Sequence, residues 1–313
     1  MPTLLTDRTF SFDHLPLGSS GPPGDAATKP GTWLKAAPDT SEVIPSRARP
    51  GRRACRMVHR PGSSPYGAGY RIQANAWPWG EVTGTEGWYA TAFLLPTGFS
   101  PLATWLILTQ LHHGANTGSP PLAVRADRFW SDTNPGRVML VGRDTPGGKD
   151  LPSTLMPTVP VGQPVRVVMR VVWGSPGVVE AWVHTGPPGE ASPASLGDWT
   201  RASPAGGWKG TTIFPGDTQS YWTVGAYTGS QSQAVTVEHD GLVRRQTAAA
   251  CLEWLAATTT TPPPPPPSVP TDAVRDLEAV TAQLAETARD TQAAGLMVGT
   301  VIERLRAGGG SGA

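Results

Sequence analysis

Short runs of β-branched and aromatic residues, each closed by Gly or Pro, follow one another from residue 51 to residue 257. This stretch has no helical period of useful length, and its alternating runs have the composition of strands. Two runs, RVVMRVVW and TWLILTQL, are apolar on both faces, as inner strands are. We therefore predict a mainly β fold, an antiparallel sandwich or jelly roll of the concanavalin A-like kind. The expected strands are Ala54–His59, Tyr70–Trp77, Gly87–Leu95, Thr104–His112, Leu122–Ala126, Arg137–Gly142, Val165–Trp173, Val178–His184, Tyr221–Tyr227 and Ala234–Glu238.

The segments on either side of this stretch differ from it in composition. Residues 1–50 are rich in Pro, Gly and Ser with one β-like run, Thr9–Phe12, and we expect an irregular wrap over the domain surface. Residues 258–270 contain six consecutive prolines, which predict a semi-rigid polyproline linker. Residues 271–306 follow a helical pattern, and residues 307–313 form a Gly-rich flexible end.

The predicted tail helix carries an apolar stripe that a lone helix leaves unburied. Two interpretations stay open. The helix either associates with copies of itself or another subunit, a trimer being favoured, or it folds back on its own domain. The quasi-heptad consists of Val274, Leu277, Thr281, Leu284, Ala288, Thr291, Gly295, Val298, Ile302 and Leu305.

Composition limits the classes of partner. Charged residues make up 16% of the chain and the net charge is +1, so no whole-protein field steers it to nucleic acid or anionic membrane. No run of 18 apolar residues predicts a membrane span, and the start, MPTLLTDRTF, lacks the pattern of a signal peptide. Cys55 and Cys251 form no disulfide framework; we interpret them as buried free thiols, with a single bridge as the alternative.

Cofactor motifs are missing from the sequence. There is no phosphate loop, nucleophile elbow or dinucleotide fingerprint, and no Cys/His spacing fits zinc. We expect no cofactor and no catalytic metal, while a structural calcium held by loop carboxylates is compatible with the sequence. Glu81 and Glu86 lie in a Gly-rich stretch and we interpret them as loop residues, which disfavours a retaining hydrolase.

Three expected strands each present a polar face and a core face, because side chains alternate along a strand. If these strands are neighbours in one sheet, their polar faces line a single groove. Trp77, Trp79 and Trp130 lie near them and can add stacking platforms. The polar faces carry Arg71, Gln73 and Asn75; Gln110 and His112; and Tyr221, Thr223 and Tyr227.

These residue types suit β-elimination on a uronate-containing polysaccharide. Such a reaction must offset the carboxylate charge, remove the proton beside it and protonate the leaving oxygen. Arg71 and Gln110 are candidates to hold the carboxylate, His112 or Tyr227 to act as base, and Tyr227 to act as acid.

The segments RIQANAW, QLHH and YWTVGAY resemble the three signature strands of jelly-roll polysaccharide lyases of the alginate, glucuronan and heparin type. The resemblance covers roughly residues 50–245 and implies catalytic roles for Arg71, Gln110, His112 and Tyr227. Two positions depart from it: Gln73 stands where the family usually has Glu, and Thr223 where it has Lys. The resemblance therefore implies either a lyase of altered specificity or a glycan binder on a lyase scaffold.

The layout of a Trp-rich sandwich, polyproline spacer, oligomerising helix and Gly-rich end resembles a minor tail protein of a phage. The Arg-rich, Ala-rich composition is typical of a GC-rich genome. The resemblance implies that the host is an actinobacterium. This resemblance implies a virion protein that binds host cell-envelope polysaccharide and contacts other tail proteins. Two alternatives stay open: an active lyase, and a structural tail or decoration subunit with a vestigial groove.

Overall fold

The computed structural model describes residues 2–20, 24–25, 29–30, 32–34, 38–65, 69–76, 79–99, 104–113, 120–127, 130–131, 134–143, 150–158, 160–214 and 220–256. The chain divides into two compact units, residues 1–260 and 261–313, and all described residues belong to the first. The predicted linker (258–270), tail helix (271–306) and flexible end (307–313) lie outside the described residues.

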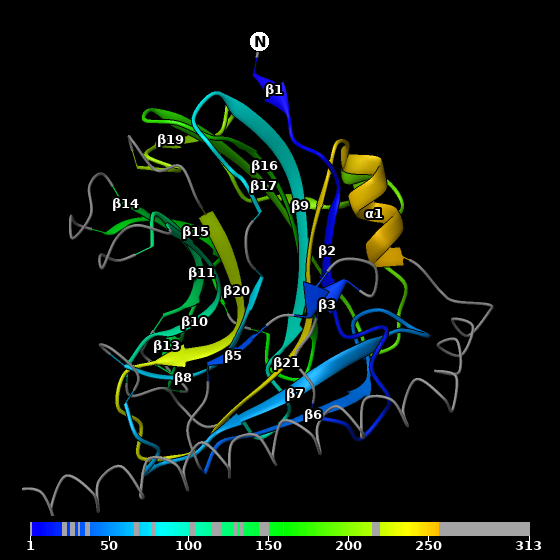
Figure 1. Cartoon of the computed structure of the whole chain (residues 1–313), viewed down its shortest axis with the longest axis vertical. Helices are drawn as coiled ribbons and strands as arrows, with labels where there is room; N and C mark the ends of the chain where they lie inside the picture. Colours follow the sequence, from blue (N-terminus) through cyan, green and yellow to red (C-terminus); the bar gives the residue numbers. More distant parts are fainter. Residues whose placement is uncertain are drawn as a thin grey trace, which may run out of the picture. The chain divides into compact units, whose positions relative to one another are not determined.

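Two sheets make up the described unit (Figure 1). We call the larger one sheet A; it has 12 strands. Its main path runs β18 (Thr200–Arg201), β17 (Gly177–Thr185), β16 (Pro164–Val172), β9 (Thr85–Leu94), β21 (Val235–Arg245), β2 (Arg8–Ser11), β3 (Gly24–Asp25) and β4 (Lys29–Pro30). Four further strands pair beside this path, β1 (Thr3–Leu4), β6 (Thr40–Pro45), β7 (Arg53–His59) and β19 (Trp208–Gly210).

Sheet B has seven strands and is curved, with its concave side facing away from sheet A (Figure 1). We call this concave side the outer face of sheet B. A small ribbon of β12 (Trp130–Ser131) and β13 (Asn134–Pro135) pairs with neither sheet. The order in sheet B is β15 (Asp150–Met156), β14 (Val138–Arg143), β11 (Leu122–Ala126), β10 (Leu106–His113), β20 (Ser220–Thr228), β8 (Tyr70–Ala76) and β5 (Thr32–Leu34).

The predicted antiparallel sandwich is confirmed. All pairings within the described residues are antiparallel apart from that of β1 with β9. The sequence did not predict β15, which contains Pro152. Because β15 forms the edge of sheet B, a residue that cannot donate to a ladder is tolerated there.

The main core fills the space between the two sheets. Ile72 and Ala74 of β8 alternate with the polar residues of that strand and are fully buried. They pack in one cluster with Phe93 of sheet A and Trp222 of β20. The apolar half of each strand therefore faces inward, which leaves the polar half on the outer face of sheet B.

The N-terminal segment is more regular than the sequence predicted. β2 pairs with β21, and β6 pairs with β7, so both strands extend sheet A. Val43 and Ile44 of β6 are buried. The described part of residues 1–50 therefore belongs to the sandwich rather than forming an irregular wrap over it, because β2 and β6 are hydrogen-bonded to strands of sheet A that follow residue 51.

A short helix, α1 (Ala248–Ala256), lies on the far side of sheet A from sheet B (Figure 1). Its residues Cys251, Leu252 and Leu255 pack with Ala90 and Val168 in a second cluster. Cys251 and Cys55 are both buried thiols outside any disulfide, as the first interpretation expected. No helix among the described residues is long and apolar enough to cross a membrane.

Candidate functional site

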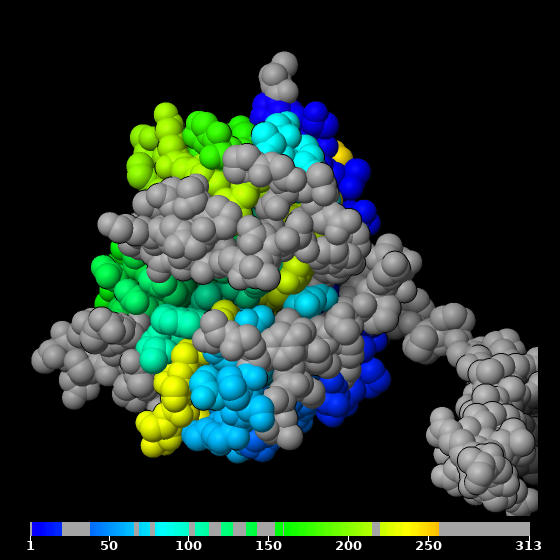
Figure 2. All heavy atoms as spheres, turned by 60° about the vertical axis from the view of Figure 1, so that its left-hand side comes forward, coloured from blue at the N-terminus to red at the C-terminus, as the bar shows by residue number. Residues whose placement is uncertain are grey.

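Strands β8, β20 and β10 are adjacent in sheet B, as the single-groove hypothesis required. Tyr227 pairs with Arg71, and Thr223 pairs with Asn75 on one side and Gln110 on the other. The expected polar residues of the three strands therefore share the outer face of the sheet. Figure 2 views the molecule from this side.

A bulge in β10 assembles this face. The register of β10 shifts between Ile107 and Thr109 against both neighbouring strands. Thr109 turns to the core, where its hydroxyl contacts His239 Nε2 at 3.0 Å. Ile107 packs with Tyr227 on the outer face, the face that also holds Gln110. Bulges commonly re-aim side chains in this way next to binding sites.

The centre of the face is formed by two glutamines. Gln110 Nε2 donates to Gln73 Oε1 at 3.2 Å, and both side chains are fully buried. Gly225, which pairs with Gln73, has φ +135°. A Cβ at Gly225 would lie 2.4 Å from the carbonyl oxygen of Ile72. Glycine is therefore required at this point of the G-x-Y signature, because any side chain would collide with β8.

Polar atoms that lack a hydrogen-bond partner among the described residues gather around this pair. Asn75 Oδ1 and Thr223 Oγ1 are buried atoms of this kind. The same holds for Gln73 Nε2 and Gln110 Oε1. Buried polar groups are ordinarily satisfied, because leaving one unpaired costs about 1–3 kcal/mol. Four such atoms on one face leave hydrogen-bonding capacity that water or a polar ligand can fill.

His112 and Tyr221 form one end of the site. Their rings stack with centroids 5.1 Å apart and planes 9° apart. Tyr221 lies directly opposite His112 in the pairing of β10 and β20. The sequence placed Tyr221 among the glycan-binding residues but did not predict this stacking.

Arg71 and Tyr227 form the other end. The guanidinium of Arg71 lies 4.1 Å from the centre of the Tyr227 ring, and Trp105 meets that ring edge-on at 4.8 Å. The Tyr227 ring also packs over Gly69, where a Cβ would lie 2.6 Å from the ring. Gly69 precedes β8, so the ring leans away from His112.

The structure therefore separates the two residues proposed as base and acid. Tyr227 lies six residues along β20 from Tyr221, the partner of His112. At about 3.3 Å per residue, the backbones of Tyr221 and Tyr227 are about 20 Å apart along the strand. Arg71 and Tyr227 are brought together, and Gln73 with Gln110, whereas His112 and Tyr227 are not.

Arg125 also lies on this face, and the sequence did not single it out. It pairs with Ile107, which pairs with Tyr227, which pairs with Arg71. Arg125 Nη2 lies 3.8 Å from Asp127 Oδ1, a long ion pair, and its side chain is 16% exposed. The alternation of LAVRA in β11 is the signal that would have placed it there.

The sequence match to a known family includes the strands that form this site. The sequence matches the polysaccharide lyase family over residues 22–242. The chain belongs to this family.

Solved structures share the fold at low sequence identity. An alginate lyase bound to an alginate trisaccharide aligns with a TM-score of 0.50 and 14% identity, over 78% of this chain and 99% of that one. The catalytic domain of a glycoside hydrolase family 131 protein from Coprinopsis cinerea aligns with a TM-score of 0.50 and 10% identity, over 77% and 95%. An endo-β-1,4-glucuronan lyase from Trichoderma reesei has a TM-score of 0.48 and 18% identity, over 69% and 90%. No curated protein matches the sequence.

Of the three tryptophans expected to stack on sugar in this lyase-family domain, only Trp79 has a described side chain. Trp79 belongs to the core cluster between the sheets, and its ring lies 5.6 Å from the guanidinium of Arg244. It is 6% exposed, so it offers no stacking surface. Trp77 lies outside the described residues, and only the backbone of Trp130 is described, in β12.

Glu81 is not an ordinary loop residue. Its carboxylate is fully buried and accepts hydrogen bonds from Ser220 Oγ at 2.7 Å and Trp222 Nε1 at 3.2 Å. Arg244 Nη1 donates to it at 2.9 Å. Ser220 and Trp222 flank Tyr221 in β20. Glu81 therefore fixes the strand that carries the His112–Tyr221 stack, a role that sequence spacing alone could not reveal.

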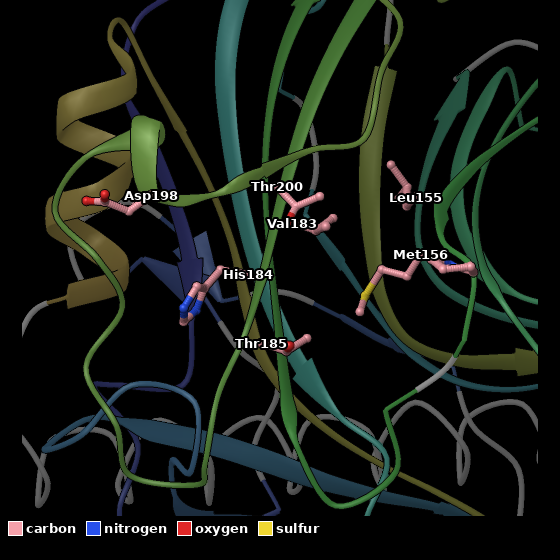
Figure 3. Close-up of a pocket in the computed structure, with 8 residues that line it drawn as sticks. Leu155, Met156, Val183, His184, Thr185, Asp198 and Thr200 are labelled. Atoms are coloured by element: carbon pink, nitrogen blue, oxygen red, sulfur yellow. The ribbon is translucent and has the colours of Figure 1, made fainter.

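A pocket of about 230 Å³ lies elsewhere, at the open edge between the sheets. In Figure 3, Leu155 and Met156 of β15 face Val183 and Thr200, while His184 lies on the side of β17 toward α1. None of the predicted site residues lines it. Within the described part of the chain, no group of three or more His, Cys, Asp or Glu side chains is placed to hold a metal ion.

Proposed function

We propose that the outer face of sheet B binds a polysaccharide. The observation that carries this proposal is the cluster of four buried polar atoms without partners among the described residues, which belong to Gln73, Asn75, Gln110 and Thr223. Sugar hydroxyls donate and accept hydrogen bonds and therefore match such a surface. Membership of the polysaccharide lyase family supports the same class of ligand.

Aromatic and cationic groups at the ends of the cluster support binding of an acidic glycan. Arg71 lies over the Tyr227 ring at one end, and the His112–Tyr221 stack lies at the other. An arginine fork recognises a carboxylate through two parallel hydrogen bonds. We expect uronate groups to bind on the row of residues that contains Arg71.

Affinity measurements on purified protein test this proposal. Isothermal titration with soluble uronate-containing polysaccharides should give binding that Arg71→Met weakens at least tenfold. Arg201→Met is the matched control, because Arg201 lies in sheet A, is 40% exposed and should not contribute. Equal affinity of the two variants, with both folded by circular dichroism, would contradict the proposal.

A lyase activity is the second candidate, and the shared face of Arg71, Gln110, His112 and Tyr227 favours it. In a β-elimination a base removes the proton beside the carboxylate, the bond to the leaving oxygen breaks and a double bond forms. That oxygen then takes up a proton. The six-residue spacing between Tyr227 and the partner of His112 argues for binding over turnover in the arrangement seen here.

Ultraviolet absorbance separates the two candidates, because an unsaturated uronate absorbs and a bound polymer does not. Absorbance growth that His112→Ala abolishes would establish a lyase. Comparison of Tyr227→Phe with Tyr221→Phe would then identify the tyrosine involved, since Tyr221 is the one that stacks on His112. A flat trace with intact binding would identify a glycan-binding domain.

The proposal also includes a place in a phage tail, where the domain attaches the particle to host envelope polysaccharide. The sequence layout supports this, with six prolines followed by a heptad-like tail that suits a trimer. Leu284→Asp in the full chain should convert a trimer to a monomer by sedimentation. Peptides of this chain in purified phage particles would support the placement, and their restriction to the soluble lysate would contradict it.

A further inference from the structure

The two central glutamines leave the same hydrogen-bonding capacity whichever way their amides are oriented. With Gln110 Nε2 donating to Gln73 Oε1, the groups left over are Gln73 Nε2 and Gln110 Oε1. If both amides are flipped, Gln73 donates to Gln110, and one unbonded NH2 group and one unbonded carbonyl oxygen again remain. The pair therefore always leaves one NH2 group as a donor and one carbonyl oxygen as an acceptor.

The neighbours of the pair are also uncharged. Thr223 is fully buried and Asn75 lies beside it across the β8–β20 pairing. The four side chains at the centre, Gln73, Asn75, Gln110 and Thr223, are therefore all uncharged.

Two arginines on the outer face, Arg71 and Arg125, lie beside this centre. Arg71, Tyr227, Ile107 and Arg125 follow one another on four adjacent strands. At about 4.8 Å per strand the two arginines are about 14 Å apart across the sheet. Ile107 and Tyr227 form an apolar floor between them. The face therefore carries two separated guanidinium groups, of which that of Arg125 also contacts Asp127.

A carboxylate does not suit the centre, because it offers only acceptors. Whichever way the two glutamine amides are oriented, it would meet their unbonded carbonyl oxygen with no donor to give, and it would lose its hydration without a cation in contact. A hydroxyl pair or an acetamido group offers both a donor and an acceptor. Such groups match what the glutamine pair leaves over.

We propose that the centre of the site takes an uncharged sugar unit and that acidic units bind beside it, along the row of Arg71 and Arg125. The substrate class is then a mixed polysaccharide in which neutral units separate the uronates, rather than a homopolyuronate. This inference rests on the proposed function, polysaccharide binding on this face.

Titration calorimetry with three polymers of matched length tests the inference. The probes are hyaluronate, which alternates glucuronate with N-acetylglucosamine, polyglucuronate, and carboxyl-reduced polyglucuronate. We expect hyaluronate to bind at least tenfold tighter than polyglucuronate. Equal or tighter binding of polyglucuronate would overturn the neutral centre while leaving the proposed function intact. Binding of none of the three would contradict the proposed function itself.

Two substitutions at the centre sharpen the test. Thr223→Lys should raise the affinity for polyglucuronate at least tenfold, and Thr200→Lys, on exposed β18, is the control for added charge. Because Thr223 is fully buried, Gln73→Glu serves as a second variant of nearly the same shape. It removes the amide donor and should weaken hyaluronate binding at least fivefold. Unchanged affinities in both variants would overturn the inference.

Discussion

Sheets A and B differ in how their buried polar groups are paired. In sheet A, Arg244 of β21 pairs with Glu81 at 2.9 Å, and Asp240 of the same strand pairs with Arg49 at 2.9 Å. On the outer face of sheet B, the central amides and Thr223 keep atoms without partners among the described residues. Charges that are paired hold strands in place, whereas neutral groups that lack a partner keep unused hydrogen-bonding capacity. On the proposed function, sheet A supplies stability and sheet B supplies recognition.

At neutral pH, breaking the buried ion pair at Glu81 should have the largest effect. Glu81→Gln leaves the Arg244 guanidinium, 1% exposed, without its counter-charge. Removal of one partner of a buried pair costs about 3–5 kcal/mol. Urea unfolding should show this loss in the free energy of unfolding. A loss below about 1 kcal/mol would mean that the charges near Glu81 do not stabilise the fold.

Acid sensitivity should follow His239, which lies between the two sheets. Burial lowers the pKa of His239 to about 3, so the folded protein holds it neutral. In the unfolded chain His239 takes up a proton below about pH 6.5. The stability that depends on a neutral His239 is therefore fully present above pH 6.5 and is lost as the pH falls toward 3. The loss is on the order of 5 kcal/mol. His239→Asn should flatten the pH dependence of urea unfolding in this window.

Asp240 provides the opposite sign as a control. Burial raises the pKa of Asp240 to about 6, against the lowering effect of Arg49. The contribution of protonated Asp240 to the free energy of unfolding is complete below about pH 3.8 and is lost as the pH rises toward 6. Asp240→Asn should therefore steepen the net acid loss of stability that His239→Asn flattens. The same slope in both variants would contradict the assignment.

Two buried threonines give a matched comparison, Thr212, which follows β19 of sheet A, and Thr223 of β20 in sheet B. Thr212 Oγ1 accepts from Gly174 N at 2.9 Å and donates to Val172 O at 3.0 Å, whereas Thr223 Oγ1 has no partner among the described residues. Thr212→Val should lower the free energy of unfolding by about 1–3 kcal/mol. Thr223→Val should leave it unchanged or raise it, while weakening glycan binding. Equal destabilisation by the two variants in urea would remove the distinction between satisfied and unsatisfied sites.

The smallest effect should come from Arg125. Arg125→Ala should weaken binding of an acidic polysaccharide about three- to tenfold, that is by about 1 kcal/mol, and reduce its dependence on salt. Arg137→Ala is the control, because Arg137 contacts the same Asp127 but is 53% exposed. Calorimetry at two salt concentrations measures both quantities. Identical behaviour of the two variants would remove Arg125 from the binding face.

The alternation of polar and apolar residues along the expected strands predicted both the fold class and the residues that share the outer face of sheet B. RIQANA places Arg71, Gln73 and Asn75 on one face with Ile72 and Ala74 opposite, and the structure has this arrangement. The β class follows from the same rule, because a period of two matches a pleated strand with one face buried. The roles of Glu81 and Arg125 were not predicted, since they depend on residues distant in the chain.

The sequence by itself determined the β class, the polar faces and the neutral residues at positions 73 and 223, because these depend on neighbours within a few residues. Only the tertiary structure decided that β8, β20 and β10 are adjacent and that a bulge brings Ile107 to the face of Gln110. It also decided that Trp79 is buried and that His112 stacks on Tyr221 rather than meeting Tyr227. Strand order and register arise from contacts between residues far apart in sequence, and no local pattern encodes them.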